Sequence, residues 1–120
     1  MLRPASLVLA AALIAAPAFA HPKLVGTVPA ANATVSALTS IGLSFSERVV
    51  PRFTGATVTM TTGIGVGHAV AGLTLEFGAD GKSLKLASAH PLARGSYIVA
   101  WHAVAGDTHR VAGNFAFKVR

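Results

Sequence analysis

The chain has 120 residues, carries ten Lys and Arg against four Asp and Glu, and contains no cysteine. A chain of this length holds one small domain. Its basic residues are scattered instead of forming a run with interleaved aromatic residues, so the sequence offers no support for nucleic-acid binding. Without cysteine, disulfides and thiolate ligands are excluded, and any metal site must use His, carboxylate, Met or backbone groups.

The first twenty residues have the layout of a secretory signal peptide. Arg3 precedes an apolar run over residues 7–16, and Pro17 is followed by a small-x-small site at 18–20. A membrane anchor is the alternative, but the run is shorter than the roughly 20 residues that a bilayer requires. We therefore expect cleavage after this site and a mature domain over residues 21–120.

The rest of the chain alternates apolar and polar residues with a period of two. Such runs, separated by Gly, Pro, Asn and Ser, are typical of half-buried antiparallel strands. About seven of them predict an all-β fold, a two-sheet sandwich with an immunoglobulin-like build, and a small open barrel is the alternative. The clearest runs cover residues 41–45, 56–60, 73–77, 84–86, 97–103 and 115–119.

Turn signals occupy the segments between these runs. We expect a loop over residues 27–35 and a flexible Gly-rich loop over 63–68, which no helix follows and which is therefore a poor phosphate cradle. "GADGKS" at 78–83 predicts a hairpin turn. We find neither a linker nor an internal repeat, so the mature chain is interpreted as one domain.

Asp107 and His109 form the one tightly spaced pair among the five histidines and four acidic residues. Their spacing of two allows both side chains to share one face of an extended segment. The segment lies between the runs 97–104 and 111–119, and loops at the end of a rigid sandwich commonly carry sites. An ordinary polar turn is the alternative.

His21 is the first residue after the expected cleavage site. A free α-amine and Nδ1 of the same residue can chelate one metal ion, and Pro22 has no amide hydrogen to lose, so its nitrogen cannot become the next ligand. Further ligands must come from elsewhere, and Asp107 and His109 are the best candidates. Nitrogen ligands with one carboxylate suit Cu(II), with Zn(II) and Ni(II) as alternatives. The alternative is that His21 has no role in metal binding.

Three stretches carry a resemblance to a known family. They are "HPKLVGTVPAANATV" at 21–35, "IGLSFSERV" at 41–49 and "YIVAWHAVAGDTHRVAGNFAFKV" at 97–119. In sequence and in order they resemble the CopC family of periplasmic copper-binding, copper-resistance proteins, over essentially the whole mature chain. The resemblance implies a small Greek-key β-sandwich in the periplasm.

The resemblance also implies a ligand set for Cu(II). The mature N-terminal histidine and the Asp and His of the D-x-H motif correspond to His21, Asp107 and His109. Glu47, in the "FSE" segment, is expected to be a minor ligand or to touch a ligand, with an uninvolved surface carboxylate as the alternative. Trp101 is expected to fill the core between the sheets.

The chain departs from those members of the family that bind Cu(I) in a Met-rich loop. The corresponding segment, residues 59–72, contains only Met60 and His68, which are too few soft ligands for a Cu(I) site. Met60 shares the apolar face of its run with Val58 and is expected to lie in the core, and His68 is expected to be exposed. His90 and His102 are not assigned to the metal.

These observations favour a monomeric, non-enzymatic periplasmic copper carrier or buffer that binds one Cu(II) ion. The family implies an inner-membrane copper transporter or another periplasmic copper carrier as its partner. A copper-dependent oxidative enzyme that uses an N-terminal histidine chelate is one alternative. A metal-free interaction domain is the other.

Overall fold

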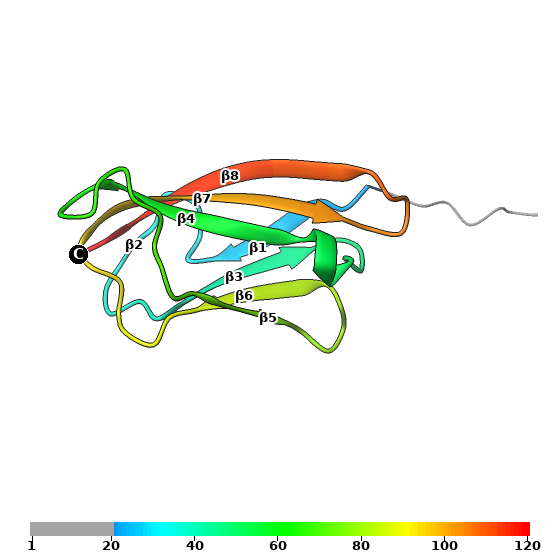
Figure 1. Ribbon diagram of the computed structural model, residues 1–120, viewed down its shortest axis with the longest axis horizontal. Helices are drawn as coiled ribbons and strands as arrows, with labels where there is room; N and C mark the ends of the chain where they lie inside the picture. Colours follow the sequence, from blue (N-terminus) through cyan, green and yellow to red (C-terminus); the bar gives the residue numbers. More distant parts are fainter. Residues whose placement is uncertain (1–20) are drawn as a thin grey trace, which may run out of the picture.

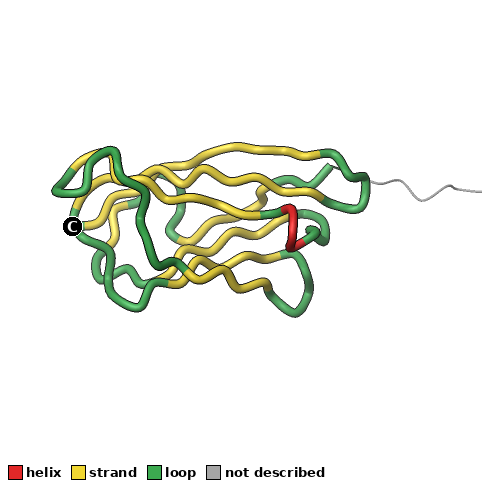
Figure 2. The backbone as a smooth tube through the Cα atoms, in the orientation of Figure 1, coloured by secondary structure: helices red, strands yellow, loops and turns green. Residues whose placement is uncertain are grey.

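Two four-stranded β-sheets pack face to face in the computed structural model (Figure 1), which describes residues 21–120. The predicted signal peptide lies outside the described residues. Within residues 21–120, no helix is long and apolar enough to cross a membrane. Figure 2 shows strands through most of the sandwich, with a single short 3-10 turn, η1 (Pro51–Phe53), at one end.

The first sheet has the strand order β1-β3-β6-β5, and its neighbouring strands are antiparallel. Its central strands join residues far apart in sequence, since Leu43 pairs with Leu84. The expected hairpin turn connects β5 to β6, and Gly81 there has a φ of 71°, which glycine adopts without strain. The strands are β1 (Leu24–Val28), β3 (Ser40–Phe45), β5 (Thr74–Phe77) and β6 (Ser83–Ala87).

The second sheet has the order β2-β8-β7-β4. Its long strands are antiparallel, and β2 pairs with β8 in parallel. The chain thus moves repeatedly between the sheets, as in a Greek-key-like sandwich. The strands are β2 (Thr34–Val35), β4 (Gly55–Thr62), β7 (Gly95–Val104) and β8 (Arg110–Val119).

The predicted sandwich is confirmed, with eight strands instead of about seven. The barrel alternative is wrong, because the strands form two separate sheets. The loop expected over 27–35 is partly wrong, since β1 extends to Val28 and β2 covers Thr34–Val35. Neither strand alternates clearly: β1 is an edge strand with a register shift between Leu24 and Gly26, and β2 has only two residues.

Alternating side chains from both sheets form the core, as their period of two predicts. In β3, for example, Ile41, Leu43 and Phe45 are buried. Met60 is buried as expected, whereas Leu75 on edge strand β5 is 43% exposed. The buried cluster consists of Ile41, Leu43, Phe45, Val49, Val58, Met60, Leu84, Leu86, Tyr97, Val99, Ala103, Phe115, Phe117 and Val119.

Trp101 packs against this core but is only partly buried. Its ring meets Phe45 edge-on, with ring centroids 5.6 Å apart. Gly113, its cross-strand partner in β8, leaves room for the indole, because a Cβ at Gly113 would lie 2.8 Å from Trp101 Cζ2. The absence of a side chain at Gly113 therefore sets the position of the indole.

We predict that Gly113→Ala lowers the free energy of unfolding by about 1–3 kcal/mol, since the added methyl group overpacks the indole. Urea denaturation measures the loss, and the emission of Trp101, the only tryptophan, reports displacement of the ring. Gly42→Ala is the control, because its Cβ would meet Val28 Cβ at an ordinary 3.8 Å. Equal stability of the two variants would contradict the packing argument.

Candidate metal centre

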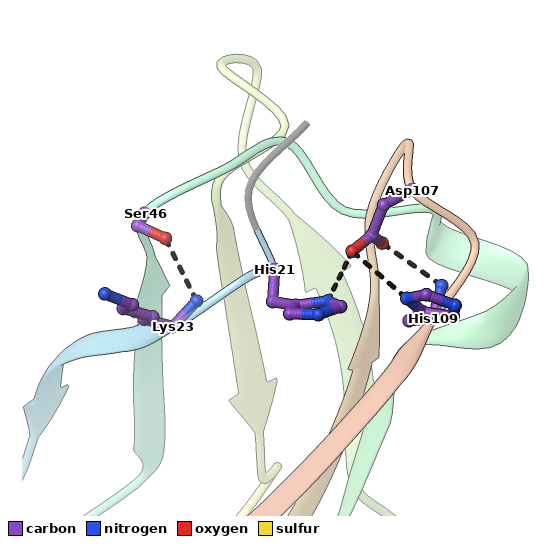
Figure 3. Close-up of polar contacts among 5 residues, drawn as sticks. All are labelled: His21, Lys23, Ser46, Asp107 and His109. Atoms are coloured by element: carbon purple, nitrogen blue, oxygen red, sulfur yellow. Dashed lines mark hydrogen bonds and ion pairs between the residues drawn. The ribbon is translucent and has the colours of Figure 1, made fainter. Parts of the chain in front are cut away.

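His21 is held at one end of the sandwich by the residues that follow it. Pro22 is buried. The Lys23 N–H donates to Ser46 Oγ at 3.0 Å (Figure 3), and the Ser46 N–H also donates to the Lys23 carbonyl at 2.9 Å. This two-way bond joins the chain before β1 to the segment after β3. In Figure 3 the imidazole of His21 points toward Asp107 in the β7–β8 connection.

Asp107 and His109 lie in that connection, which is the end loop expected from the sequence. The two-residue spacing does not act through an extended segment here, because the chain makes a turn. The Thr108 N–H donates to the Ala105 carbonyl at 3.0 Å, and Thr108 has a φ of 64°. Asp107 Oδ1 accepts the His109 N–H at 3.1 Å, as aspartate does in Asx-turns. The turn, not strand alternation, brings the two side chains together.

The three residues converge on Asp107. One ligand atom from each of His21, Asp107 and His109 lies within 4.8 Å of the other two. His21 Nδ1 is in direct contact with Asp107 Oδ2, and His109 Nδ1 lies 3.8 Å from the same oxygen. The two imidazole rings are tilted, with centroids 5.1 Å apart. Figure 3 shows both rings turned toward the carboxylate.

The donor set fits a metal ion. Asp107 Oδ2 is buried and accepts no hydrogen bond within residues 21–120, although both imidazoles approach it. A bound cation would compensate a buried carboxylate oxygen in this position. The side chain of Asp107 is 9% exposed, against 59% for His21 and 72% for His109. Solvent, or another protein, can therefore reach the two imidazoles while the carboxylate stays covered.

The other sequence candidates lie apart from this cluster. Glu47 is half-buried and does not belong to the three-residue group found in the described chain. His68 and His90 are exposed, which confirms the expectation for His68. His102 lies on the outer face of β7, where burial, and secondarily Arg110, lower its pKa. Within residues 21–120 it does not belong to the three-residue group either.

Ser46 and Thr54 position the centre, and sequence reasoning missed both. Ser46 bonds to Lys23, as described, and Thr54 Oγ1 accepts the Val104 N–H at 3.2 Å where β7 ends. Ser46 could have been identified from the sequence, because it belongs to the "FSE" motif beside Glu47. Thr54 is 5% exposed, but a single threonine after a proline turn carries no recognisable signal.

The family model described as the CopC domain matches residues 24–120. The chain belongs to the CopC family. A copper resistance protein C from Xanthomonas campestris pv. juglandis is 44% identical over 113 residues, covering 92% of this chain and 89% of the relative. The copper resistance protein C of Pseudomonas syringae pv. tomato is 40% identical over 110 residues, covering 90% and 87%.

A solved structure supports the same assignment. The chain is similar to PcoC from Escherichia coli with a TM-score of 0.77 and 41% identity, covering 84% of this chain and all of that one. That protein is described as methionine-rich. The present chain contains two methionines, one of them Met1. The present chain therefore shares the sandwich but is not methionine-rich.

We predict that Thr108→Asn raises the free energy of unfolding by about 1 kcal/mol, because a β-branched residue is strained at positive φ and asparagine tolerates it. Urea denaturation measures the change. Thr57→Asn, on an exposed strand position of β4, is the matched control and should lower stability, since asparagine is depleted in strands. A loss of stability in both variants would refute strain at Thr108.

Proposed function

We propose that the mature protein is a periplasmic carrier or buffer that binds one Cu(II) ion through His21, Asp107 and His109 and catalyses no reaction. The convergence of these three residues from opposite ends of the sequence carries the proposal. Membership of a family whose relatives are named copper resistance proteins supports copper as the metal.

The chemistry of the donor set favours Cu(II). Imidazole nitrogens with a carboxylate oxygen suit its tetragonal geometry, and Cu(II) heads the affinity order of the divalent first-row ions. The anionic Asp107 favours the more highly charged, oxidised ion. A third protein ligand beside two histidines also occupies a position that an oxygen-activating copper enzyme would leave open, which favours binding over catalysis.

Cleavage of residues 1–20 completes the centre in this proposal. The new α-amine at His21 would close a chelate ring with its own imidazole, and Pro22 would prevent the backbone from supplying the next ligand. Because Pro22 is buried and Lys23 is bonded to Ser46, the amine would be presented at a fixed place. Export and assembly of the site are thus coupled.

The protein is proposed to lack a Met-rich Cu(I) site. Met60 is 5% exposed, and its sulfur accepts the Gly65 N–H at 3.1 Å. His68 is the one histidine of residues 59–72. The protein would act as a monomer that exchanges Cu(II) with an inner-membrane copper transporter or with another periplasmic carrier.

A chain that begins at His21 should bind Cu(II) more tightly, by about a hundredfold or more, than the same chain with one glycine added before His21. The added residue removes the amine from the chelate, and a chelate gains its strength from a high effective concentration of the second ligand. Competition against a chelating dye measures the affinity. A glycine added after Arg120 is the control, and equal affinity in all three chains would exclude the chelate.

Asp107→Asn should lower Cu(II) affinity by at least about tenfold, because the amide removes the negative charge. The amide oxygen can still accept the His109 N–H, so the turn should be kept and the unfolding free energy little changed. Electron paramagnetic resonance of the loaded protein should show a changed copper spectrum. His68→Ala is the control at a distant exposed histidine, and equal losses in both variants would contradict the assignment.

A further inference from the structure

An open pocket of about 570 Å³ lies directly beside the metal centre, on the outer side of the second sheet. Its walls come from η1, from the end of β7 and from the β7–β8 turn. Gly106 and Thr108, the residues on either side of Asp107, belong to its lining. The metal centre and the pocket are therefore built on the same turn. The lining also includes Val50, Arg52, Phe53, His102, Val104, Ala105 and Arg110.

The pocket combines an apolar surface with two exposed cations. Phe53 is 51% exposed, and the Arg52 guanidinium lies 4.7 Å from the centroid of its ring. Arg110 is exposed and lies opposite Val104 in the β7–β8 ladder. Within residues 21–120 neither guanidinium takes part in an ion pair. The lining contains no acidic residue, so the surface is complementary to an anion.

His102 adds polarity to the pocket without adding charge. Burial of the ring, and secondarily the positive charge of Arg110, lower its pKa. Near neutral pH the imidazole is therefore uncharged and can donate one hydrogen bond and accept another. The two arginines remain the only charged groups among the lining residues.

Hydrogen bonds from the backbone and from the Thr54 side chain join the walls of the pocket. The Val50 N–H donates to the Val104 carbonyl at 2.7 Å, and Thr54 Oγ1 accepts the Val104 N–H at 3.2 Å. Val49 and Ala105 form an isolated bridge beside them. These bonds hold η1 against the end of β7, so a ligand would meet a preformed surface and lose less entropy on binding.

We propose that this pocket docks an acidic peptide segment of the protein with which this carrier exchanges copper. Carboxylates of the segment would pair with Arg52 and Arg110, and an apolar side chain would pack on Phe53 and Val104. Docking there places the partner beside His109, the most exposed of the three candidate ligands. Residues 21–120 contain nine Lys and Arg and four Asp and Glu, a formal charge of +5, which would speed the approach of an acidic partner. The inference rests on the proposed carrier function.

The probe is a capped, fluorescent peptide, Gly-Glu-Leu-Glu-Phe-Glu-Gly, titrated into the processed protein without copper and with Cu(II). Fluorescence polarisation gives the affinity, and NMR shifts of backbone amides locate the contact. Arg52→Ala with Arg110→Ala should weaken binding by about tenfold or more, because two charge-assisted contacts are lost. Arg94→Ala with Lys118→Ala removes the same charge at exposed positions outside the pocket and should change affinity by less than about twofold.

Amide shifts confined to residues 50–55 and 102–110, together with loss of binding only in the pocket variant, support the inference. Three results would overturn it: no binding at up to about 1 mM peptide, equal weakening in both double variants, or undiminished binding when glutamine replaces each glutamate. Binding to phosphatidylglycerol vesicles that depends on the two arginines, without peptide binding, would also overturn it and assign the surface to a membrane.

The Cu(II) affinity of the same variants separates this inference from the proposed function. Arg52→Ala with Arg110→Ala should leave copper affinity within about twofold, since neither residue belongs to the three-residue cluster. Peptide binding without copper tests the docking surface alone. A protein that binds the peptide but no copper would refute the carrier function and leave the surface standing.

Discussion

The segment over residues 46–50 ties the two sheets together at the end that carries the candidate metal centre. Its Ser46 N–H donates to the Lys23 carbonyl beside β1, and its Val50 N–H donates to the Val104 carbonyl at the end of β7. Between them, the Val49 N–H donates to the Gly81 carbonyl in the β5–β6 turn. This brace fixes the distance between the chain before β1 and the β7–β8 turn.

The centre depends on that brace because its residues belong to different sheets. His21 precedes a strand of the first sheet, whereas Asp107 and His109 follow a strand of the second. Side chains on the two layers would approach each other only transiently if the layers could slide. The brace removes that freedom in advance, so a metal ion need not supply the ordering energy. The same bonds to Val104 also shape the neighbouring pocket. The brace therefore supports both the candidate metal centre and the pocket.

Much of the fold could be predicted because a period of two determines which side chains face the core. The runs at 41–45, 84–86 and 115–119 correspond to paired strands with buried alternate positions. Strands β1 and β2 were not predicted, for two physical reasons. The edge strand β1 has a bulge and buries few side chains, so its apolar and polar residues need not alternate. Strand β2 has only two residues, which are too few to show an alternating pattern. The pairing partners of the strands could not be predicted either, since local sequence patterns do not determine which strands are neighbours.

The sequence by itself determined which residues could bind a metal: it contains no thiol, few carboxylates, and one histidine directly after a predicted export signal. Residue type and spacing are local properties, so His21, Asp107 and His109 could be chosen from them. Only the tertiary structure decided that these residues meet, because their approach depends on a turn with Thr108 at positive φ and on hydrogen bonds from Ser46 and Val50. Those hydrogen bonds join residues tens of positions apart in sequence. They cannot be predicted from the periodicity of the chain, because periodicity is a local property.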